Sequence, residues 1–344
     1  MSEILTSMVG RLFADHCSDA VVLRAEEGTW PEALWDACEA AGLALALIEA
    51  GEHSLGASAE EAFQVVRLAG RVAAPIPLPE TMLANWLLGV CGLEPRPGPL
   101  VVVASPTLHL DASGTRLIGE AAAVPWGRRA NVIACFERAG RTCMGWIGRD
   151  GFVVEQGANI AREPRDHLVF DVALSDITVT PLPPGIDAMQ LRAAGAALRC
   201  GQMAGALERV TTMTVEYTGQ RVQFGRSISK FQAVQQNVAV LASQTAAASC
   251  AADMAAEAFG NGIQLSAVAA AKTFCGEAAG LGAAIAHQVH GAMGFSQEYS
   301  LHLRTKRLWS WREEYGNEVE WSAWLGLGLL DQGADQLWAG IAAI

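Results

Sequence analysis

Charged side chains are scarce in this sequence. Of its 344 residues, 17% are Asp, Glu, Lys or Arg and 51% are hydrophobic, whereas charged residues usually make up about 25% of a soluble protein. A chain this apolar either has a very large core or buries surface against other subunits. We favour burial against other subunits, because the apolar excess lies in long, alanine-rich stretches of helical character.

Basic residues are the scarcer of the two kinds of charge. The formal net charge is −12 at pH 7, which excludes a general affinity for nucleic acid or for an anionic membrane surface. A local group of basic residues can still bind a phosphate.

Metal-type cysteine spacing and long apolar runs are also missing. None of the eight cysteines forms a CxxC pair, so we expect buried free thiols of a cytoplasmic protein and no disulfide or metal site. Residues 1–10 lack the basic stretch and apolar core of a signal peptide. The most apolar long stretch, residues 238–259, is interrupted by polar and acidic side chains, so we expect no membrane-spanning segment.

The patterns that are present divide the chain into three regions. Residues 1–97 are typical of helices, because Pro31 suits a first helical turn and residues 58–61 form a capping-box pattern. In residues 98–183, short β-rich runs alternate with turn signals, which predicts an antiparallel sheet or a small barrel. From residue 184 to residue 344 the pattern is helical again.

The last region has the composition of a helical bundle. The expected helices cover roughly residues 187–218, 230–259, 265–290 and 299–311, and another follows Glu318. Alanine and glycine recur along them and permit close approach of neighbouring helices. The sequence therefore predicts an α+β protein that is mainly α, with an N-terminal helical domain, a middle β domain and a C-terminal four-helix bundle.

Two segments of this last region carry a more specific signal. Residues 220–232 (QRVQFGRSISKFQ) resemble the R-x-x-FG-x-x-I-x-x-FQ segment between two bundle helices of acyl-CoA dehydrogenases. Residues 288–299 (QVHGAMGFSQEY) resemble the Q-x-x-GG-x-G-[FY]-x-x-EY segment of the same family. The order of the three regions matches the family fold, so the resemblance covers nearly the whole chain.

The resemblance implies FAD as the cofactor and an acyl-CoA as the substrate. In the family, these segments grip the ADP half of an FAD that is bound mainly by a neighbouring subunit. That role carries over to a set of cofactor-binding residues, namely Arg221, Phe224, Gln232, Gln288, Gly291 and Ala292. Ala292 departs from the pattern, because the family has glycine there.

The residue types suit this role. Arg221 offers a planar guanidinium that can bind a phosphate through two parallel hydrogen bonds. Gly291 and Gly294 allow the backbone to approach a ligand closely. The alternative is an arginine in a helix-end salt bridge beside an ordinary glycine turn.

A catalytic carboxylate is missing from the positions where the family carries one. The family reaction removes an α-proton from the acyl-CoA while a hydride passes from the β-carbon to the flavin, and it needs a positioned base. One family position falls on Gly195 and the other on Tyr315, whose phenol is a poor base because its ordinary pKa is about 10. Glu314 is a weak candidate for the base, and a solvated helix end is the alternative for it.

The stretches with which the family holds the isoalloxazine ring are missing as well. The T-E-P-x-A-G-S-D-like stretch is not recognisable, and residues 120–129 stand where the family has W-I-[ST]-N-G. Trp126 within them suits either a contact with a ring or the core of the β domain. The chain therefore keeps the residues that reach a neighbour's cofactor and lacks those that hold its own.

This combination resembles the heteromeric branch of the family, in which unlike subunits form α2β2 assemblies that oxidise CoA esters of steroid side chains. The resemblance implies an FAD-dependent subunit that works with a second acyl-CoA dehydrogenase subunit and passes electrons to an acceptor of the electron-transfer-flavoprotein type. Two alternatives stay open. One is a self-sufficient homo-oligomer that uses Glu314, and the other is a structural subunit that binds no cofactor.

Overall fold

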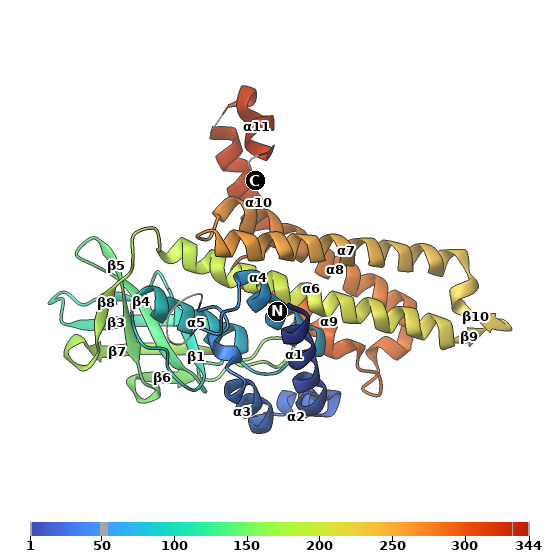
Figure 1. Ribbon diagram of the computed structural model, residues 1–344, viewed down its shortest axis with the longest axis horizontal. Helices are drawn as coiled ribbons and strands as arrows, with labels where there is room; N and C mark the ends of the chain where they lie inside the picture. Colours follow the sequence, from blue (N-terminus) through green and yellow to red (C-terminus); the bar gives the residue numbers. More distant parts are fainter. Residues whose placement is uncertain (1, 49–53, 332, 343–344) are drawn as a thin grey trace. The chain divides into compact units, whose positions relative to one another are not determined.

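The computed structural model describes residues 2–48, 54–331 and 333–342. Helices come first, β-strands follow and helices return (Figure 1), so the predicted α+β class with a mainly helical content is confirmed. Contacts divide the chain into two compact units. The bundle unit comprises Met1–Leu23, Phe63–Ala74 and Ala196–Ile344, and the β unit comprises Arg24–Ala62 and Pro75–Gly195. The domain boundaries at residues 97 and 183 stay a prediction.

The first helices begin where the sequence provides start signals. They are α1 (Ser2–His16), α2 (Asp19–Glu26), α3 (Glu32–Ala40), η1 (Leu43–Leu45), α4 (Ala59–Val72) and α5 (Leu78–Val90). α3 begins directly after Pro31. Before α4, the amide of Glu61 donates to the hydroxyl of Ser58 at 3.3 Å, and the amide of Ser58 donates to the carboxylate of Glu61 at 3.1 Å. The predicted capping box is therefore confirmed.

The β unit contains two four-stranded sheets, ordered β1-β4-β5-β8 and β2-β3-β7-β6. Their strands are β1 (Leu100–Val103), β2 (His109–Leu110), β3 (Arg116–Pro125), β4 (Asn131–Arg138), β5 (Arg141–Ile147), β6 (Phe152–Glu155), β7 (Arg165–Ala173) and β8 (Val179–Pro181). The expectation of purely antiparallel pairing was wrong for one pair, because β1 runs parallel to β4. Between them the chain forms β2 and β3 in the other sheet, and this crossover returns it in the same direction.

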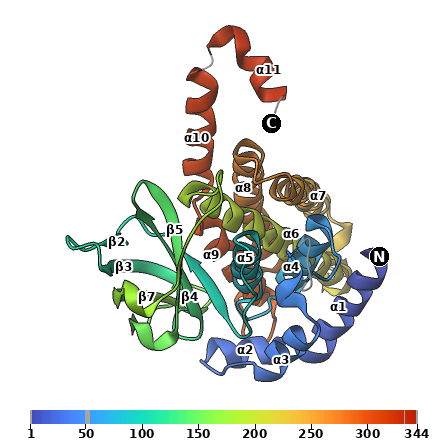
Figure 2. The ribbon, with the colours of Figure 1, turned by 60° about the vertical axis from the view of Figure 1, so that its left-hand side comes forward.

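Both sheets contribute to one apolar core. Val132 and Phe136 of β4 belong to the same buried cluster as Leu117 of β3 and Leu168 of β7. Figure 2 shows the strands of this unit from a second side. The shared core makes the β unit a small two-sheet arrangement.

The bundle helices match the expected ranges closely. They are α6 (Ala188–Gln220), α7 (Gln232–Gly260), α8 (Leu265–His290) and α9 (Leu301–Glu313), and α10 (Glu318–Asp331) and α11 (Leu337–Ala342) follow. α8 returns along α7 after a short turn, and both figures show the two side by side. A Cβ added to Gly282 of α8 would lie 2.7 Å from Leu207 of α6 and 3.3 Å from Leu241 of α7. Small residues thus allow the three helices to approach closely.

α7 is the one helix, within the part of the chain that the structure describes, whose length and composition would allow it to cross a membrane. Its buried side chains include Leu241, Thr245, Ala248 and Ala252, which recur at helical spacing. The hydroxyl of Thr245 lies 2.7 Å from that of Thr211 on α6. This buried stripe is typical of a bundle helix.

The contact between α4 and α6 gives a test of the packing. A Cβ at Gly205 would lie 2.8 Å from the carbonyl carbon of Arg67 and 2.9 Å from the amide nitrogen of Arg71. We expect Gly205→Ala to lower the free energy of unfolding by about 1–3 kcal/mol, because backbone cannot move aside as a side chain can. Urea-induced unfolding measures the change.

The matched control is Gly219→Ala, near the end of the same helix, where the added Cβ would meet nothing within 4 Å. This change should leave the stability unchanged or raise it by about 0.5–1 kcal/mol. Equal stabilities for Gly205→Ala and the parent protein would show that α4 and α6 do not approach this closely.

Candidate cofactor-binding site

A hairpin joins α6 to α7. After α6 ends at Gln220, β9 (Val222–Gln223) pairs with β10 (Arg226–Ser227), and η4 (Ile228–Lys230) leads into α7. The two residues of the turn, Phe224 and Gly225, both have positive φ, 51° and 79°. This conformation is typical of tight hairpins but is uncommon for a bulky residue. It leaves the ring of Phe224 91% exposed.

The second segment begins where α8 ends. Gly291 has φ 59° and ψ −141°, and a Cβ added there would meet nothing within 4 Å. Glycine is therefore needed for the backbone conformation rather than for space. Ala292 lies in η5 (Gly291–Phe295) and is not among the residues with positive φ. Alanine is thus compatible with this position, at which the family has glycine.

Tyr217 joins the two segments. Its hydroxyl donates to the carbonyl of His290 at 3.3 Å, and the two rings stack with centroids 4.4 Å apart. The hydroxyl of Tyr299 lies 3.3 Å from Nε2 of the same histidine. Since α7 and α8 are antiparallel, the start of α7 lies at this end of the bundle too. The six predicted cofactor-binding residues are therefore brought to one end of the bundle unit.

The polar members of this set are available to a ligand. Arg221, Gln232 and Gln288 are exposed, and their side chains make no hydrogen bond or ion pair with any residue that the structure describes. The alternative of a helix-end salt bridge for Arg221 is therefore not seen there. Arg226 and Lys230 add positive charge nearby in a chain whose net charge is −12. This end of the bundle can attract an anion.

The two histidines at this end are packed rather than presented to a ligand. Burial lowers the pKa of His287 and the pKa of His290. His287 stacks between Phe295 and Trp309, and Nδ1 of His290 lies 2.8 Å from the carbonyl of Ala286. Both rings therefore favour the neutral form and position the end of α8 by contact.

The candidate base Glu314 has a buried cationic partner. Nε and Nη2 of Arg199 lie 2.8 and 2.7 Å from the Glu314 carboxylate, and Arg199 is 1% exposed. The same guanidinium lies over the Tyr315 ring, 5.5 Å from its centroid. An arginine so placed supplies the carboxylate with a buried counter-charge. Glu314 is not a solvated helix-end charge, and its role as the base stays a prediction.

A lysine that the sequence analysis did not single out holds the turn beside Glu314. The ammonium of Lys272, on α8, is fully buried and donates to the carbonyls of Arg312 and Gly316, each at 2.6 Å. Burial lowers its pKa to about 8. Tyr315 between these carbonyls has φ 57°, and its own carbonyl accepts from the indole of Trp321 at 3.0 Å. Buried charge and an indole thus fix the turn that carries Tyr315.

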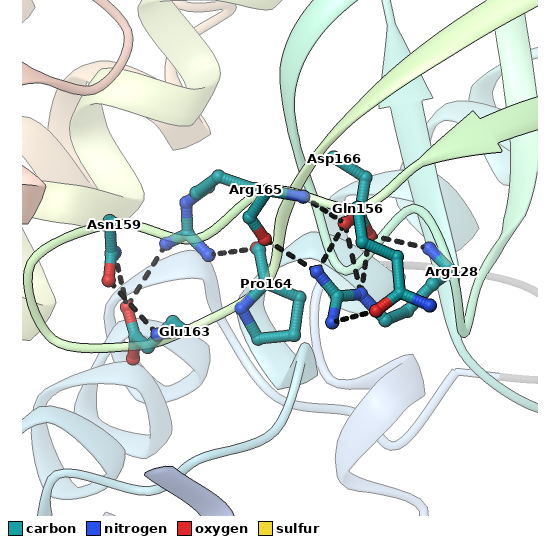
Figure 3. Close-up of polar contacts among 8 residues, drawn as sticks. Arg128, Gln156, Asn159, Glu163, Pro164, Arg165 and Asp166 are labelled. Atoms are coloured by element: carbon teal, nitrogen blue, oxygen red, sulfur yellow. Dashed lines mark hydrogen bonds and ion pairs between the residues drawn. The ribbon is translucent and has the colours of Figure 1, made fainter. Parts of the chain in front are cut away.

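Polar side chains of the β unit satisfy one another (Figure 3). The fully buried Asp166 accepts hydrogen bonds from the side chain of Arg128 and from the amides of Arg128 and Gly157. Trp126, also in the β unit, is buried with its ring against Trp30, with the centroids 5.8 Å apart. These contacts favour a core role for Trp126.

Comparison with known proteins identifies the bundle. Residues 184–312 match the family described as "Acyl-CoA dehydrogenase, C-terminal domain". This part of the chain is similar to the C-terminal domain of acyl-CoA dehydrogenases. The predicted resemblance to the acyl-CoA dehydrogenase family is therefore confirmed, and the match contains both sequence segments and all but the last residue of α9.

Similar acyl-CoA dehydrogenases extend the match over the rest of the chain. The chain is 27% identical to "Acyl-CoA dehydrogenase IpdE2" of Mycobacterium tuberculosis over 311 residues, which cover 89% of this chain and 90% of that protein. This relative spans both units.

Solved structures show the same fold. One is described as "Tcur3481-Tcur3483 steroid ACAD G363A variant", with a TM-score of 0.83, 22% identity and coverage of 97% of this chain and 98% of that one. Another is the ChsE4-ChsE5 complex from Mycobacterium tuberculosis, with a TM-score of 0.79, 22% identity and coverage of 96% and 97%. The chain has the acyl-CoA dehydrogenase fold throughout.

The Arg199–Glu314 pair gives a testable difference between two neighbouring glutamates. We expect Glu314→Gln to lower the free energy of unfolding by about 3 kcal/mol, because it leaves a buried guanidinium without its counter-charge. Glu313→Gln is the control, since Glu313 is exposed and its pairing with Arg312 should contribute within about 0.5 kcal/mol. Equal losses for the two variants would contradict the buried pair.

Lys272 should give the stability of the chain a specific dependence on pH. Its pKa is about 8 in the folded chain and about 10.4 when unfolded. Between these values the unfolded chain binds a proton that the folded chain has released, so the free energy of unfolding should rise with pH.

Denaturant unfolding at pH 7, 8, 9 and 10 measures this contribution as the difference between the parent protein and Lys272→Met, which should lack the rise. Lys230→Met, which removes an exposed lysine, should retain it. Parallel curves for the parent protein and Lys272→Met would contradict a depressed pKa.

Proposed function

We propose that the chain is a subunit of a heteromeric, FAD-dependent acyl-CoA dehydrogenase and contributes to an FAD site shared with an unlike subunit. One observation carries the proposal. Arg221, Gln232 and Gln288 gather at one end of the bundle unit, exposed and without a side-chain partner among the described residues. Polar side chains left free in this way suit a ligand that a second chain helps to hold.

The residues at this end fit the ADP half of FAD. Arg221 can bind the pyrophosphate through two parallel hydrogen bonds, and Gln232 and Gln288 offer amides that both donate and accept. The open face of Gly291 lets a ligand approach its backbone. The exposed ring of Phe224 supplies a flat apolar surface beside them. FAD, when bound, accepts the hydride that leaves the β-carbon of the substrate.

The base that removes the α-proton belongs, in this proposal, to the partner subunit. Tyr315 stands where many acyl-CoA dehydrogenases carry a glutamate, and a phenol is a poor base at neutral pH. Glu314 beside it is already paired with the buried Arg199. This pairing supports a partner-supplied base over a self-sufficient enzyme that uses Glu314.

The substrate class is proposed from the relatives. The Tcur3481-Tcur3483 steroid ACAD and the ChsE4-ChsE5 complex share this fold. They support an acyl-CoA with a bulky, steroid-type acyl group and a partner subunit, and we propose an α2β2 assembly from the resemblance of the sequence. We further propose a cytoplasmic enzyme that passes its electrons to an acceptor of the electron-transfer-flavoprotein type.

The test compares flavin contents. Purified alone, the chain should retain little FAD; purified after co-expression with an unlike acyl-CoA dehydrogenase subunit from the same source, the complex should retain FAD stoichiometrically. In that complex, Arg221→Ala should weaken FAD binding about tenfold or more, because one charged hydrogen-bond donor to the pyrophosphate is lost. Absorbance at the flavin bands and titration of the apo-complex with FAD measure both effects.

Arg11→Ala is the control, since it removes an exposed arginine from α1 and so an equal charge. It should leave the flavin content unchanged. Full FAD occupancy in the chain alone would overturn the shared site, and normal FAD binding by Arg221→Ala would favour a subunit that binds no cofactor.

A further inference from the structure

The last helices form an extension that we call the C-terminal arm, comprising α10, η6 (Ala334–Gln336) and α11. Its base is anchored, because Trp321 is buried and its indole donates to the carbonyl of Tyr315. Beyond Trp321, no described side chain of the arm is buried. In Figures 1 and 2 the arm extends away from α7 and α8, the helices with which it shares the bundle unit.

The exposed surface of the arm is apolar and arranged in helical stripes. Trp324, Leu327 and Leu330 follow at intervals of three on α10, and Leu337, Trp338 and Ile341 lie on one side of α11. Leu327 is 64% exposed, Leu330 76% and Trp338 79%. Two short helices cannot cover such side chains by themselves, and contiguous exposed apolar surface marks an interaction site.

The charges of the arm indicate which kind of partner covers its apolar surface. Its ionisable side chains are Glu318, Glu320, Asp331 and Asp335, and none of its residues is basic. Helices that bind membrane surfaces are rich in Lys and Arg on their polar face, so a lipid surface does not fit. A second copy of this chain is a poor fit as well, because each copy has a net charge of −12. An unlike chain with an apolar surface and a rim of Lys and Arg fits both features.

We infer that the C-terminal arm is the element that docks on the unlike subunit of the heteromer. This inference rests on the proposed function, because it assumes that such a subunit exists. The two exposed tryptophans and the leucines between them form the apolar centre, and Asp331 and Asp335 lie at the rim. Tryptophan dominates the binding energy of many interfaces, so Trp338 is the expected anchor.

The first experiment measures the affinity of this chain for the unlike acyl-CoA dehydrogenase subunit with which it co-purifies. Leu330→Asp and Trp338→Asp should each raise the Kd at least tenfold, because each places a charge in the apolar centre. The melting temperature of the chain alone should not change, since both side chains are largely exposed. Val153→Asp on β6, also strongly exposed, is the matched control and should leave the Kd unchanged.

Further variants distinguish a loss of docking from a loss of folding. Ending the chain after Asp331 removes α11 without removing any described buried side chain, and it should weaken association as Trp338→Asp does. The charge-reversal pair Asp331→Lys and Asp335→Lys should slow association at low salt and match the parent protein at high salt.

Several results would overturn the inference. An unchanged Kd for both aspartate variants would do so, as would a homodimer of this chain that Trp338→Asp dissociates. Sedimentation of the parent chain, but not of Trp338→Asp, with phosphatidylcholine vesicles would assign the arm to a membrane instead.

Flavin content separates this inference from the proposed function. If only the docking role is wrong, the aspartate variants still assemble and the complex carries FAD. If only the shared site is wrong, the variants weaken assembly, while Arg221→Ala leaves the flavin content unchanged.

Discussion

Close packing of α6, α7 and α8 is the constraint on which the candidate site depends. A Cβ at Gly282 would lie 2.7 Å from the Leu207 side chain and 3.3 Å from the Leu241 side chain, so a larger residue there would require both leucines to move. Because α8 returns antiparallel along α7, its last residues lie beside the hairpin that follows α6. The contact of Tyr217 with His290 then fixes the distance between two segments that are far apart in the sequence. Polar residues that would be isolated on single helices become one surface.

The sequence predicted those features that depend on local signals. Pro31 and the capping box at Ser58 mark helix starts because capping is a contact between near neighbours. Residues 220–232 and 288–299 were recognisable because their residue types occur at the same spacing in acyl-CoA dehydrogenases. Pairing between distant residues left no such mark. The parallel register of β1 with β4 depends on contacts between strands that are distant in the sequence. The strand β5 depends on its pairing with β4, because Gly145 interrupts the β-rich pattern of its own sequence.

The buried charges could not be predicted from the sequence either, because their partners are also distant in the chain. Arg199 and Glu314 are 115 residues apart, and nothing near either residue indicates the other. Lys272 stands in an alanine-rich helix, where a lone basic residue is the only signal that a buried acceptor must exist. Such groups cost desolvation energy that apolar residues would avoid. What they provide is position, since together they hold a turn in which Tyr315 has an uncommon backbone conformation.

The interleaving of the two units has a consequence for how the chain acquires its structure. The chain passes between the units after residues 23, 62, 74 and 195, and the last passage lies inside the 33-residue helix α6. No single proteolytic cut separates one unit from the other, and a cut at residue 195 would break a helix. During synthesis, α1 and α4 leave the ribosome long before the later helices of the bundle unit, which begin with α6. The bundle unit can therefore be completed only after the C-terminal half of the chain has been synthesised.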